Sequence, residues 1–460
     1  YYGIPGIGAI CHTLNPRLSA EQMTYIVGHA EDKAMFLDLT FVPLIEKMQA
    51  HFPANMIYVI MTDAAHMPEN SFNALCYEDL LAAQDSDYDW PDLPEDTACG
   101  LCYTSGTTGN PKGALYSHRS QVLHGMMVAL QAYKCMRPGT KILPVVPLFH
   151  ANSWGLAHAA PIVGANLIMP GPALDGASVF NLMDSEEVYS AWGVPTVWLG
   201  LMGEIQKQGR IPKGFGEVVI GGSAAAPALI KRFEERGVEV LHAWGMTEMS
   251  PVGTMGLLPP HMESLPLDER VAMKAKQGRR TFGVDLKIVD ESGARLPHDG
   301  QANGELYVRG NGIVSGYFKN EEATQKAMDA EGWFGTGDVA TISPEGFLTI
   351  TDRAKDLIKS GGEWISSIDV ENMALGHEHI ANCAVIAVPH PKWDERPLLV
   401  AVAAVDSPDK ASIMALLAQH LAKWQLPDEI LFVEDLPLTA TGKVSKLTLR
   451  QTFSEYELPG

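Results

Sequence analysis

A run of glycine and hydroxyl-bearing residues at 103–113 could bind a phosphate group. It reads Tyr-Thr-Ser-Gly-Thr-Thr-Gly-Asn-Pro-Lys-Gly, follows an apolar segment at 98–103 and precedes a helical pattern at 117–133. Glycines allow backbone N–H groups to turn toward one anion, hydroxyls add donors, and Lys112 adds a positive charge. We therefore expect a strand, a phosphate-binding loop and a helix in that order. The loop residues that could contact a phosphate are Thr104, Ser105, Gly106, Thr107, Thr108 and Gly109.

This loop differs from the P-loop of common nucleotide hydrolases. Counting from Gly106, that motif would require glycine at position 111, and residue 111 is proline. An ordinary surface turn would need only one or two glycines. The sequence thus predicts a phosphate-binding loop with a different geometry.

The overall charge limits the kinds of partner. The chain of 460 residues has a net charge of −21 and a pI near 5.1. A protein that binds nucleic acid or an anionic membrane without sequence preference needs a basic surface, so both classes are disfavoured. An anionic substrate must instead meet cations that are concentrated locally.

Cysteine usage indicates a reducing compartment. Six cysteines in this length are too few for a secreted disulfide framework, so we expect a cytoplasmic protein. Cys99 and Cys102 have redox-motif spacing, but they lie in the predicted strand at 98–103. Positions three apart in a strand point to opposite faces, which argues against a disulfide between them.

No segment predicts a membrane span. The most apolar stretch, residues 154–169, is interrupted by His158, Pro161 and Asn166. The N-terminus has no basic region followed by an apolar run. Because the first residue is Tyr1, we expect the natural start of the protein to lie upstream of this sequence.

Alternating helical and β-rich patterns must position the loop. Such alternation predicts an α/β fold with parallel or mixed sheets flanked by helices. In the first hundred residues, helices are expected at 21–30 and 42–50, with strands at 34–39, 55–61 and 98–103. Further strands are expected at 143–147, 166–169, 194–197 and 217–220.

The second half of the chain changes character twice. Residues 283–317 are rich in glycine and predict strands at 284–289 and 305–309, which suggests a small β lobe. Beyond residue 353 a compact α+β pattern runs to the end of the chain. It predicts helices near 368 and at 411–424, with strands at 384–388 and 399–405.

Six ordered motifs between residues 103 and 443 resemble those of the adenylate-forming superfamily, which contains acyl-CoA synthetases, luciferases and peptide-synthetase adenylation domains. Within it, the chain looks most like bacterial medium- and long-chain fatty-acyl-CoA synthetases, including the ligases of 3-methylmercaptopropionate. Besides the loop at 103–113, the motifs are Ala-Trp-Gly-Met-Thr-Glu at 243–248, residues 304–310 with 316–318, Gly-Trp-Phe-Gly-Thr-Gly-Asp at 332–338, residues 352–363, and Pro-Leu-Thr-Ala-Thr-Gly-Lys at 437–443.

The resemblance implies a two-step reaction in two domains. A carboxylate attacks the α-phosphate of ATP to give an acyl-adenylate, and the thiol of coenzyme A then displaces AMP. The implied domains are a large N-terminal adenylation domain at 1–352, whose true start is missing, a hinge at 353–355 and a small mobile C-terminal domain at 356–460. The hinge position is Lys355, about which the C-terminal domain would turn between the steps.

Site residues also follow from the resemblance. Lys443 would approach the α-phosphate and the carboxylate, Glu248 would hold Mg²⁺, and Thr247 would contact an α-phosphate oxygen. His150 would orient or gate the acid. Trp244 would stack on adenine, and Asp338 would accept both ribose hydroxyls. The implied nucleotide-binding residues are those of the loop with Lys112, Gly222, Ser223, Ala224, Ala243, Trp244, Gly245, Asp338 and Arg353.

The resemblance implies binding regions for the acid and for coenzyme A. The apolar walls around the acid would be Trp154, Val194, Pro195, Met246 and Val252. The pantetheine channel would involve Lys359, Gly361 and Gly362. Such walls suit an aliphatic acid, and Trp154 could shorten the space and favour a small one. No Asp or Lys is placed to pair with an amino acid, which disfavours a peptide-synthetase domain.

Several alternatives stay open at this point. The acid could be a short or medium aliphatic or methylthio acid, or a longer fatty acid, and the acceptor could be a carrier protein and not free coenzyme A. A luciferase-like oxygenase would need a luciferin. The chain could also be a non-catalytic nucleotide-binding protein, or an inactive fragment. A homodimer is compatible with the sequence.

Overall fold

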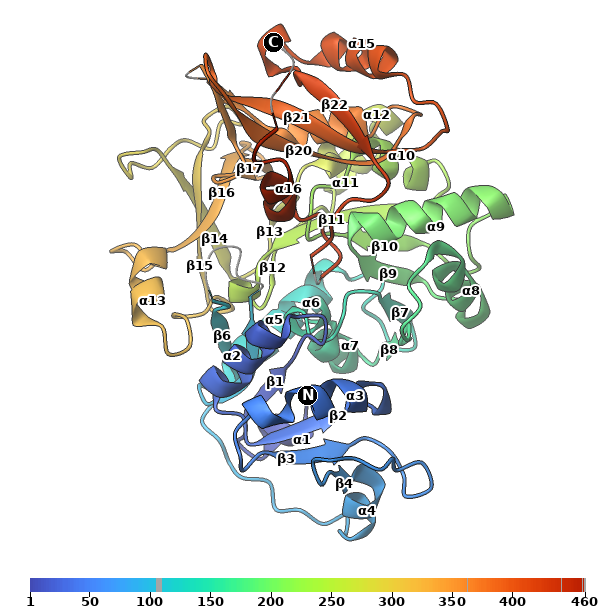
Figure 1. Cartoon of the computed structure of the whole chain (residues 1–460), viewed down its shortest axis with the longest axis vertical. Helices are drawn as coiled ribbons and strands as arrows, with labels where there is room; N and C mark the ends of the chain where they lie inside the picture. The colour runs from blue at the N-terminus through green and yellow to red at the C-terminus, as the bar shows by residue number, and fades with distance from the viewer. Residues whose placement is uncertain (105–109, 362, 440, 457, 459–460) are drawn as a thin grey trace. The chain divides into compact units, whose positions relative to one another are not determined.

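The computed structural model describes residues 1–104, 110–361, 363–439, 441–456 and 458 (Figure 1). The chain forms two compact units. The first consists of Tyr1–Arg119 and Tyr317–Asn320, and the second of Ser120–Gly316 and Glu321–Gly460.

The first unit contains the predicted alternation of helices and strands. One sheet has parallel strands in the order β2, β3, β4, and another has the order β1, β5, β6. Apolar side chains of α2, β2 and α3, such as Val27, Leu37 and Ile45, pack together as its core. The elements are α1 (Gly3–Gly6), β1 (Cys11–Thr13), α2 (Ala20–Ala30), β2 (Ala34–Leu37), α3 (Val42–Met48), β3 (Ile57–Ile60), β4 (Leu75–Cys76), α4 (Tyr77–Ala82), β5 (Ala98–Tyr103) and β6 (Gly113–Ser117).

The expected strand–loop–helix order around the phosphate loop is wrong. The loop joins two antiparallel strands, with Tyr103 of β5 opposite Gly113 of β6, and the Thr104 N–H donates to the Lys112 carbonyl at 2.8 Å. Helix α5 (His118–Gln131) begins only after β6. The physical reason is the alternation in β6, where Ala114 and Tyr116 are buried on one face as a strand requires. Residues 103 and 113 are therefore paired across two antiparallel strands, and the loop between them does not lead directly into a helix.

A large sheet forms the centre of the second unit, with parallel pairing from β8 to β11 and antiparallel pairing at β12 and β13. The carboxyl ends of parallel strands meet at one edge, so the segments that follow them gather there. In sheet order the strands are β13 (Arg279–Arg280), β12 (Val252–Met255), β11 (Glu239–Gly245), β10 (Glu217–Ile220), β9 (Ser190–Gly193), β7 (Lys141–Pro144) and β8 (Asn166–Leu167).

The strand expected at 194–197 is wrong. The chain forms β9 at Ser190–Gly193, and helix α9 (Pro195–Gln208) starts directly after Val194. Proline is favoured at the first position of a helix because its fixed φ suits the helix and its missing N–H would have no partner there. Pro195 therefore starts the helix where the apolar run had suggested a strand.

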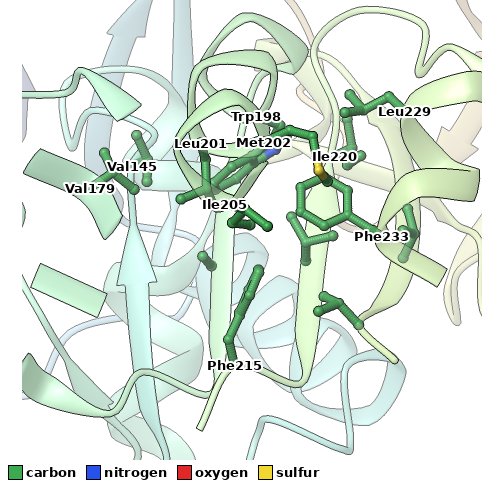
Figure 2. Close-up of a cluster of buried hydrophobic side chains, with 14 of the residues drawn as sticks. Val145, Val179, Trp198, Leu201, Met202, Ile205, Phe215, Ile220, Leu229 and Phe233 are labelled. Carbon is green, nitrogen blue, oxygen red and sulfur yellow. The ribbon is translucent and has the colours of Figure 1, made fainter. Parts of the chain in front are cut away.

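Helices cover both faces of this sheet. On one face, α8 (Gly176–Glu186), α9, α10 (Pro227–Glu234) and α12 (Leu267–Ala275) supply apolar side chains. Figure 2 shows Trp198, Leu201 and Ile205 of α9 grouped with Ile220 of the sheet and Phe233 of α10. On the other face, α5 and α7 (Leu156–Val163) contribute side chains to a second core that also contains Trp192 and Leu241. The connections contain α6 (Ala151–Trp154), whose backbone is left-handed, and the short helix α11 (Pro260–Glu263).

A carboxyl group lies buried at the start of β10. Glu217 has no exposed surface, and its Oε1 accepts a hydrogen bond of 2.7 Å from the Ser190 hydroxyl, which in turn accepts one from the Trp192 indole. Burial raises the pKa of Glu217. The stabilisation by the protonated group is complete below the unfolded pKa of about 4.3 and is lost as the pH rises through the folded pKa.

Glu217→Gln is therefore expected to stabilise the fold at alkaline pH. The amide has nearly the same shape and cannot ionise, so the variant should melt higher than wild type at pH 8 and equally near pH 4. Thermal unfolding followed by circular dichroism across this range measures the difference, with the exposed Glu235→Gln as control. An offset in melting temperature that does not change with pH would contradict the assignment.

A β lobe follows the large sheet, and the expectation for it is confirmed. Its antiparallel strands are β14 (Val284–Val289), β15 (Gly304–Gly310), β16 (Phe334–Ile342) and β17 (Leu348–Arg353), with α13 (Glu321–Ala327) between β15 and β16. Asp338 of β16 lies directly opposite Arg353 of β17. This register places two predicted site residues side by side.

The C-terminal segment forms the predicted α+β arrangement (Figure 1). Its sheet has the order β19, β18, β21, β20, with β22 paired to β21. Apolar side chains of α14 and α15 pack with Val385 and Leu399 in its core, whereas Leu449 of α16 packs with Ile386. The elements are β18 (Ile358–Ser360), β19 (Glu363–Ile365), α14 (Ser367–Ala374), β20 (Ile380–His390), β21 (Asp394–Ala403), α15 (Lys410–His420), β22 (Glu429–Val433) and α16 (Lys446–Thr452).

Two further expectations concern cysteines and membranes. Cys99 and Cys102 are both buried in β5, and no disulfide joins any of the cysteines that the structure describes. Among the helices that the structure describes, none combines the length and apolar character needed to cross a membrane.

Candidate active site

The side chain of Lys443 reaches the turn that follows β10. A Cβ atom placed on Gly222 would lie 3.0 Å from the Lys443 Cε and 3.4 Å from its Nζ, and 3.3 Å from the Val194 Cγ1. Gly222 also has a φ of +78°, which side chains rarely adopt. Glycine at 222 therefore leaves the space in which the Lys443 ammonium lies against the carboxyl edge of the sheet.

The loop that carries Lys443 is fastened to helix α9. The Thr196 hydroxyl, in the first turn of that helix, donates a hydrogen bond of 3.0 Å to the Gly442 carbonyl. Within the loop, the Lys443 N–H donates to the Thr439 hydroxyl at 3.2 Å. These bonds hold a residue from the C-terminal segment at the edge of the large sheet.

Charged groups around Lys443 influence one another. Burial, followed by the Arg353 guanidinium, lowers the pKa of Lys443 to about 8, whereas Asp338 acts to raise it. Burial, followed by the Lys443 ammonium, lowers the pKa of His150 to about 3. At neutral pH the lysine is therefore mostly protonated and the histidine neutral.

Asp338 is a buried carboxylate held by two donors. Its side chain is 4% exposed, its Oδ1 lies 2.9 Å from the Arg353 Nε, and its Oδ2 accepts a hydrogen bond of 3.0 Å from the Trp244 Nε1. Burial raises the pKa of Asp338, although Arg353, Trp244 and Lys443 all act to lower it. No local sequence signal indicates the contact between Trp244 and Asp338, because 94 residues separate them.

The residues at the ends of β10 and β11 line this edge. Gly222, Ser223 and Ala224 follow β10 in the turn that leads to α10, while Ala243, Trp244 and Gly245 end β11. A Cβ on Gly245 would lie only 1.9 Å from the Pro251 carbonyl oxygen, so no larger residue fits there. Both predicted strand-end motifs thus lie at the same edge of the sheet.

A left-handed turn positions Trp154. The φ angles of Ala151, Asn152, Ser153 and Trp154 lie between +46° and +56°, and Gly155 follows at +82°. The left-handed conformation costs about 1–2 kcal/mol for each residue with a side chain, so the surrounding contacts must hold it. One such contact is the hydrogen bond of 2.7 Å from the Ser153 hydroxyl to the Val146 carbonyl. No sequence signal predicted this turn.

The turn directs Trp154 toward the end of β10. A Cβ on Gly221 would lie 3.0 Å from the Trp154 Cη2. Trp154, Val194, Ala243 and Val252 belong to one buried apolar cluster. Most of the predicted acid-binding walls therefore lie together beside Gly221, while Pro195 begins α9 and Met246 follows β11.

Glu248 is the predicted ligand of Mg²⁺. It lies in the short 3-10 helix Thr247–Met249, is 5% exposed, and its carbonyl accepts a hydrogen bond from the Val314 N–H at 2.8 Å. Over the residues that the structure describes, no three His, Cys, Asp or Glu side chains are grouped as a metal site. Mg²⁺ usually takes one or two carboxylates and completes its shell with phosphate oxygens and water, so a single buried carboxylate fits this ion.

The predicted phosphate loop belongs to the first unit. The Lys112 N–H lies 3.4 Å from the Thr104 hydroxyl, and the Lys112 ammonium lies 4.8 Å from the centre of the Tyr317 ring. A cation above an aromatic face is attracted by the ring quadrupole, which holds the ammonium in place. Ser105, Gly106, Thr107, Thr108 and Gly109 lie outside the described residues.

The predicted hinge and coenzyme A residues follow Arg353 in the sequence. Lys355 is exposed between β17 and β18. The Lys359 N–H donates to the Glu395 carboxylate at 2.9 Å, and a Cβ on Gly361 would lie 2.8 Å from the Trp393 ring. In the described parts of the chain, no hydrogen bond links Lys359 or Gly361 to Lys443. Gly362 lies outside the described residues.

Comparison with family models and curated proteins gives consistent matches. The model described as "AMP-binding enzyme" matches residues 1–318, and the one described as "AMP-binding enzyme C-terminal domain" matches residues 369–443. A medium-chain-fatty-acid–CoA ligase of Ectopseudomonas oleovorans is 47% identical over 99% of this chain and 83% of that protein. A 3-methylmercaptopropionyl-CoA ligase of Ruegeria pomeroyi is also 47% identical, over 99% of this chain and 84% of that protein.

Solved structures share the fold. The anthranilate CoA ligase AuaEII, determined in complex with anthranoyl-AMP, matches with a TM-score of 0.85 over 98% of this chain and 84% of that chain, at 24% identity. At this identity the likeness shows the architecture alone. It agrees with the expected large N-terminal region followed by a smaller C-terminal one.

Proposed function

The chain belongs to the family of AMP-binding enzymes, and from that premise we propose that it is an ATP-dependent carboxylate–CoA ligase. In the first step a carboxylate oxygen bonds to the α-phosphorus of ATP and pyrophosphate leaves. In the second the thiol sulfur of coenzyme A bonds to the acyl carbon, AMP leaves, and the thiol proton is released. The observation that carries the proposal is the approach of Lys443 to Gly222, where Arg353 and Asp338 act on it electrostatically.

In the first step these residues would bind ATP and offset its charge. The carboxylate oxygens of Asp338 each take one protein donor, and an oxygen can accept a second hydrogen bond, so the ribose hydroxyls have acceptors. The indole of Trp244 offers a face for adenine while its N–H holds Asp338. The Lys443 ammonium would stabilise the charge that develops on the α-phosphate as the acid attacks.

We propose that Glu248 binds Mg²⁺. The ion would neutralise phosphate charge when it is bound, and this carboxylate is the residue of the chain that would hold it. Thr247, one residue earlier, would donate its hydroxyl to an α-phosphate oxygen. In the first unit, the loop with Lys112 and the hydroxyl of Thr104 is the proposed phosphate-binding segment.

For the second step we propose a rotation of the C-terminal domain about Lys355. The domain would comprise residues 356–460 and the remainder residues 1–352, joined by the hinge at 353–355. Rotation would withdraw Lys443 and bring the segment of Lys359 and Gly361 to the adenylate. Trp393, which packs on Gly361, offers an aromatic surface beside this segment.

We propose a short or medium aliphatic or methylthio acid as the substrate, with a longer fatty acid as the alternative. The neutral His150 and the apolar cluster of Trp154, Val194 and Val252 support an uncharged acyl chain. The similarity to a medium-chain-fatty-acid–CoA ligase and to a 3-methylmercaptopropionyl-CoA ligase supports the same range.

Pyrophosphate release with ATP, Mg²⁺ and a panel of carboxylic acids tests the proposed function. We expect release to depend on a short or medium aliphatic acid, and a thioester to form only when coenzyme A is added. Omission of Mg²⁺ should abolish the release. No release with any acid would favour a non-catalytic nucleotide-binding protein. If a thioester formed only with a carrier protein, the acceptor would be that protein and not free coenzyme A.

Trp154→Ala is expected to shift the preference toward longer acids. Removal of the indole opens space beside Gly221, and each added methylene that it buries is worth about 0.8 kcal/mol, or about fourfold in kcat/KM. The measurement is kcat/KM over acids of increasing length. Trp154→Phe keeps an aromatic ring and serves as the control. Identical chain-length profiles for wild type and Trp154→Ala would remove Trp154 from the acid site.

Two further properties remain proposals. A cytoplasmic location is supported by the lack of a disulfide among the described cysteines, since a reducing compartment maintains thiols. A homodimer is compatible with the sequence, and sedimentation of the purified chain tests it.

A further inference from the structure

A network of hydrogen bonds between buried side chains joins the two sides of the predicted hinge. On one side is Asp352, the residue of β17 before Arg353, which is 1% exposed. Its Oδ2 accepts hydrogen bonds from the Ser367 N–H at 2.7 Å and from the Ser367 hydroxyl at 2.6 Å. Ser367 is the first residue of α14, beyond Lys355. These bonds connect the β lobe directly to the C-terminal segment.

Neighbouring contacts reinforce this crossing. The Ser366 hydroxyl donates a hydrogen bond of 2.6 Å to the Thr351 carbonyl. Ile368, two residues after Ser366, packs against the core of the β lobe, which includes Ile350. Asp352 also faces the N-terminus of α14, where a negative charge is favourable. The start of α14 is thus docked on the end of β17 by polar and apolar contacts together.

The hydrogen-bond network continues to the loop of Lys443. The Lys446 ammonium donates to the Ser367 hydroxyl at 2.6 Å and lies 2.7 Å from the Glu371 carboxylate. Although burial acts to lower it, Glu371 and Asp352 raise the pKa of Lys446, so the ammonium is charged and responds to both carboxylates. Lys446 begins α16, three residues after Lys443. The position of Lys443 is therefore linked through Lys446 and Ser367 to Asp352.

Resting on the proposed function, we propose that Asp352, Ser367 and Lys446 are positioning residues for the first half-reaction. Asp352 moves with β17 and hence with the neighbouring Asp338 of β16, whereas Ser367 and Lys446 move with the C-terminal domain. A rotation about Lys355 would separate them, so the bonds to Asp352 exist only while Lys443 lies at the nucleotide site. They hold the C-terminal domain for adenylate formation and must break before thioester formation.

Asp352→Asn and Ser367→Ala test this assignment in the full chain. Asp352→Asn keeps the size and one acceptor oxygen but loses the charge, and Ser367→Ala removes the hydroxyl that joins Lys446 to Asp352. We expect acid-dependent ATP–pyrophosphate exchange to fall about tenfold or more. Conversion of supplied acyl-adenylate and coenzyme A to the thioester should stay unchanged or become faster. Equal losses in both half-reactions, or unchanged exchange, would overturn the proposal.

A matched control and a second measurement separate this proposal from the proposed function. Lys446→Met should behave like Asp352→Asn, whereas Lys410→Met breaks an ion pair with Glu429 inside the C-terminal domain and should alter neither half-reaction. Amide hydrogen exchange at residues 366–370 should be about tenfold faster in Asp352→Asn than in wild type. Unchanged amide exchange would reject the role of Asp352 in holding the start of α14, even if wild type were inactive with every acid. If wild type were inactive but amide exchange were faster in Asp352→Asn, the proposed function would be rejected and the contact across the hinge would be supported.

Discussion

Lys443→Ala is expected to reduce acid-dependent ATP–pyrophosphate exchange by about a hundredfold to a thousandfold, while supplied acyl-adenylate is still converted to the thioester at a rate close to that of wild type. The magnitude is that of removing a group which stabilises developing charge in a reaction. The asymmetry follows because Lys443 contacts Gly222 in the arrangement proposed for the first step and would leave the site before the second.

The pH dependence supplies a second expected result for the same residue. With a pKa of about 8, Lys443 is protonated at neutral pH and loses its charge above pH 8. The kcat/KM for ATP reports ionisations of the free enzyme, so it should fall on the alkaline side with a midpoint near pH 8. This limb should be absent from the residual activity of Lys443→Ala.

Lys326→Ala is the control for this substitution. Lys326 is 76% exposed in α13 and pairs only weakly with Glu322 four residues earlier. Its replacement should leave both half-reactions and the pH profile unchanged. An equal loss of both half-reactions in Lys443→Ala would contradict a role for Lys443 that is confined to the first step.

Asp338→Asn is expected to raise the KM for ATP by about tenfold to a hundredfold with a smaller change in kcat. A hydrogen bond to a charged group contributes about 1.5–3 kcal/mol, and each 1.4 kcal/mol is a factor of ten in affinity. The amide keeps one acceptor, but its NH₂ group faces either Arg353 or Trp244, both of which are donors. The variant therefore removes one acceptor for the ribose hydroxyls and also disturbs the hydrogen bonds from Arg353 and Trp244.

Asp285→Asn provides a matched control for Asp338→Asn. Asp285 lies on β14 in the same β lobe and also pairs with arginine, Arg280, but its side chain is 52% exposed. We expect no change in the KM for ATP from this control. Steady-state kinetics with ATP as the varied substrate, together with thermal unfolding of each variant, measures the difference. An unchanged KM in a folded Asp338→Asn protein would exclude Asp338 from the nucleotide site.

Local patterns were sufficient for most elements of the fold. The strands at β5 and β10 were predicted with their observed bounds, because a short apolar run between polar or glycine residues leaves few other structures. The β lobe and the C-terminal α+β region were also predicted. Failure occurred where two local preferences competed. At 113–117 a short strand was missed between the loop and the predicted helix, and at Pro195 an apolar run concealed a helix start.

The candidate site was predicted as a set of residues but not as a geometry. Motif order identified Lys443, Asp338, Arg353 and Trp244, since each belongs to a short stretch that can be recognised alone. It did not reveal that the Trp244 N–H holds Asp338, or that Asp352 meets Ser367 across the hinge. Those pairs come from different strands and helices, so their approach depends on sheet register and domain packing.

By itself, the sequence determined the family, the type of chemistry and most of the elements, because glycines, prolines and apolar periodicity act over a few residues. Only the tertiary structure decided which groups meet. It brought Lys443 to Gly222 and formed the left-handed turn that directs Trp154 to Gly221. The turn is locally unfavourable, and burying a lysine beside an arginine lowers its pKa. Neither would form in a short peptide, since each is stabilised by contacts that exist only after the whole unit has folded.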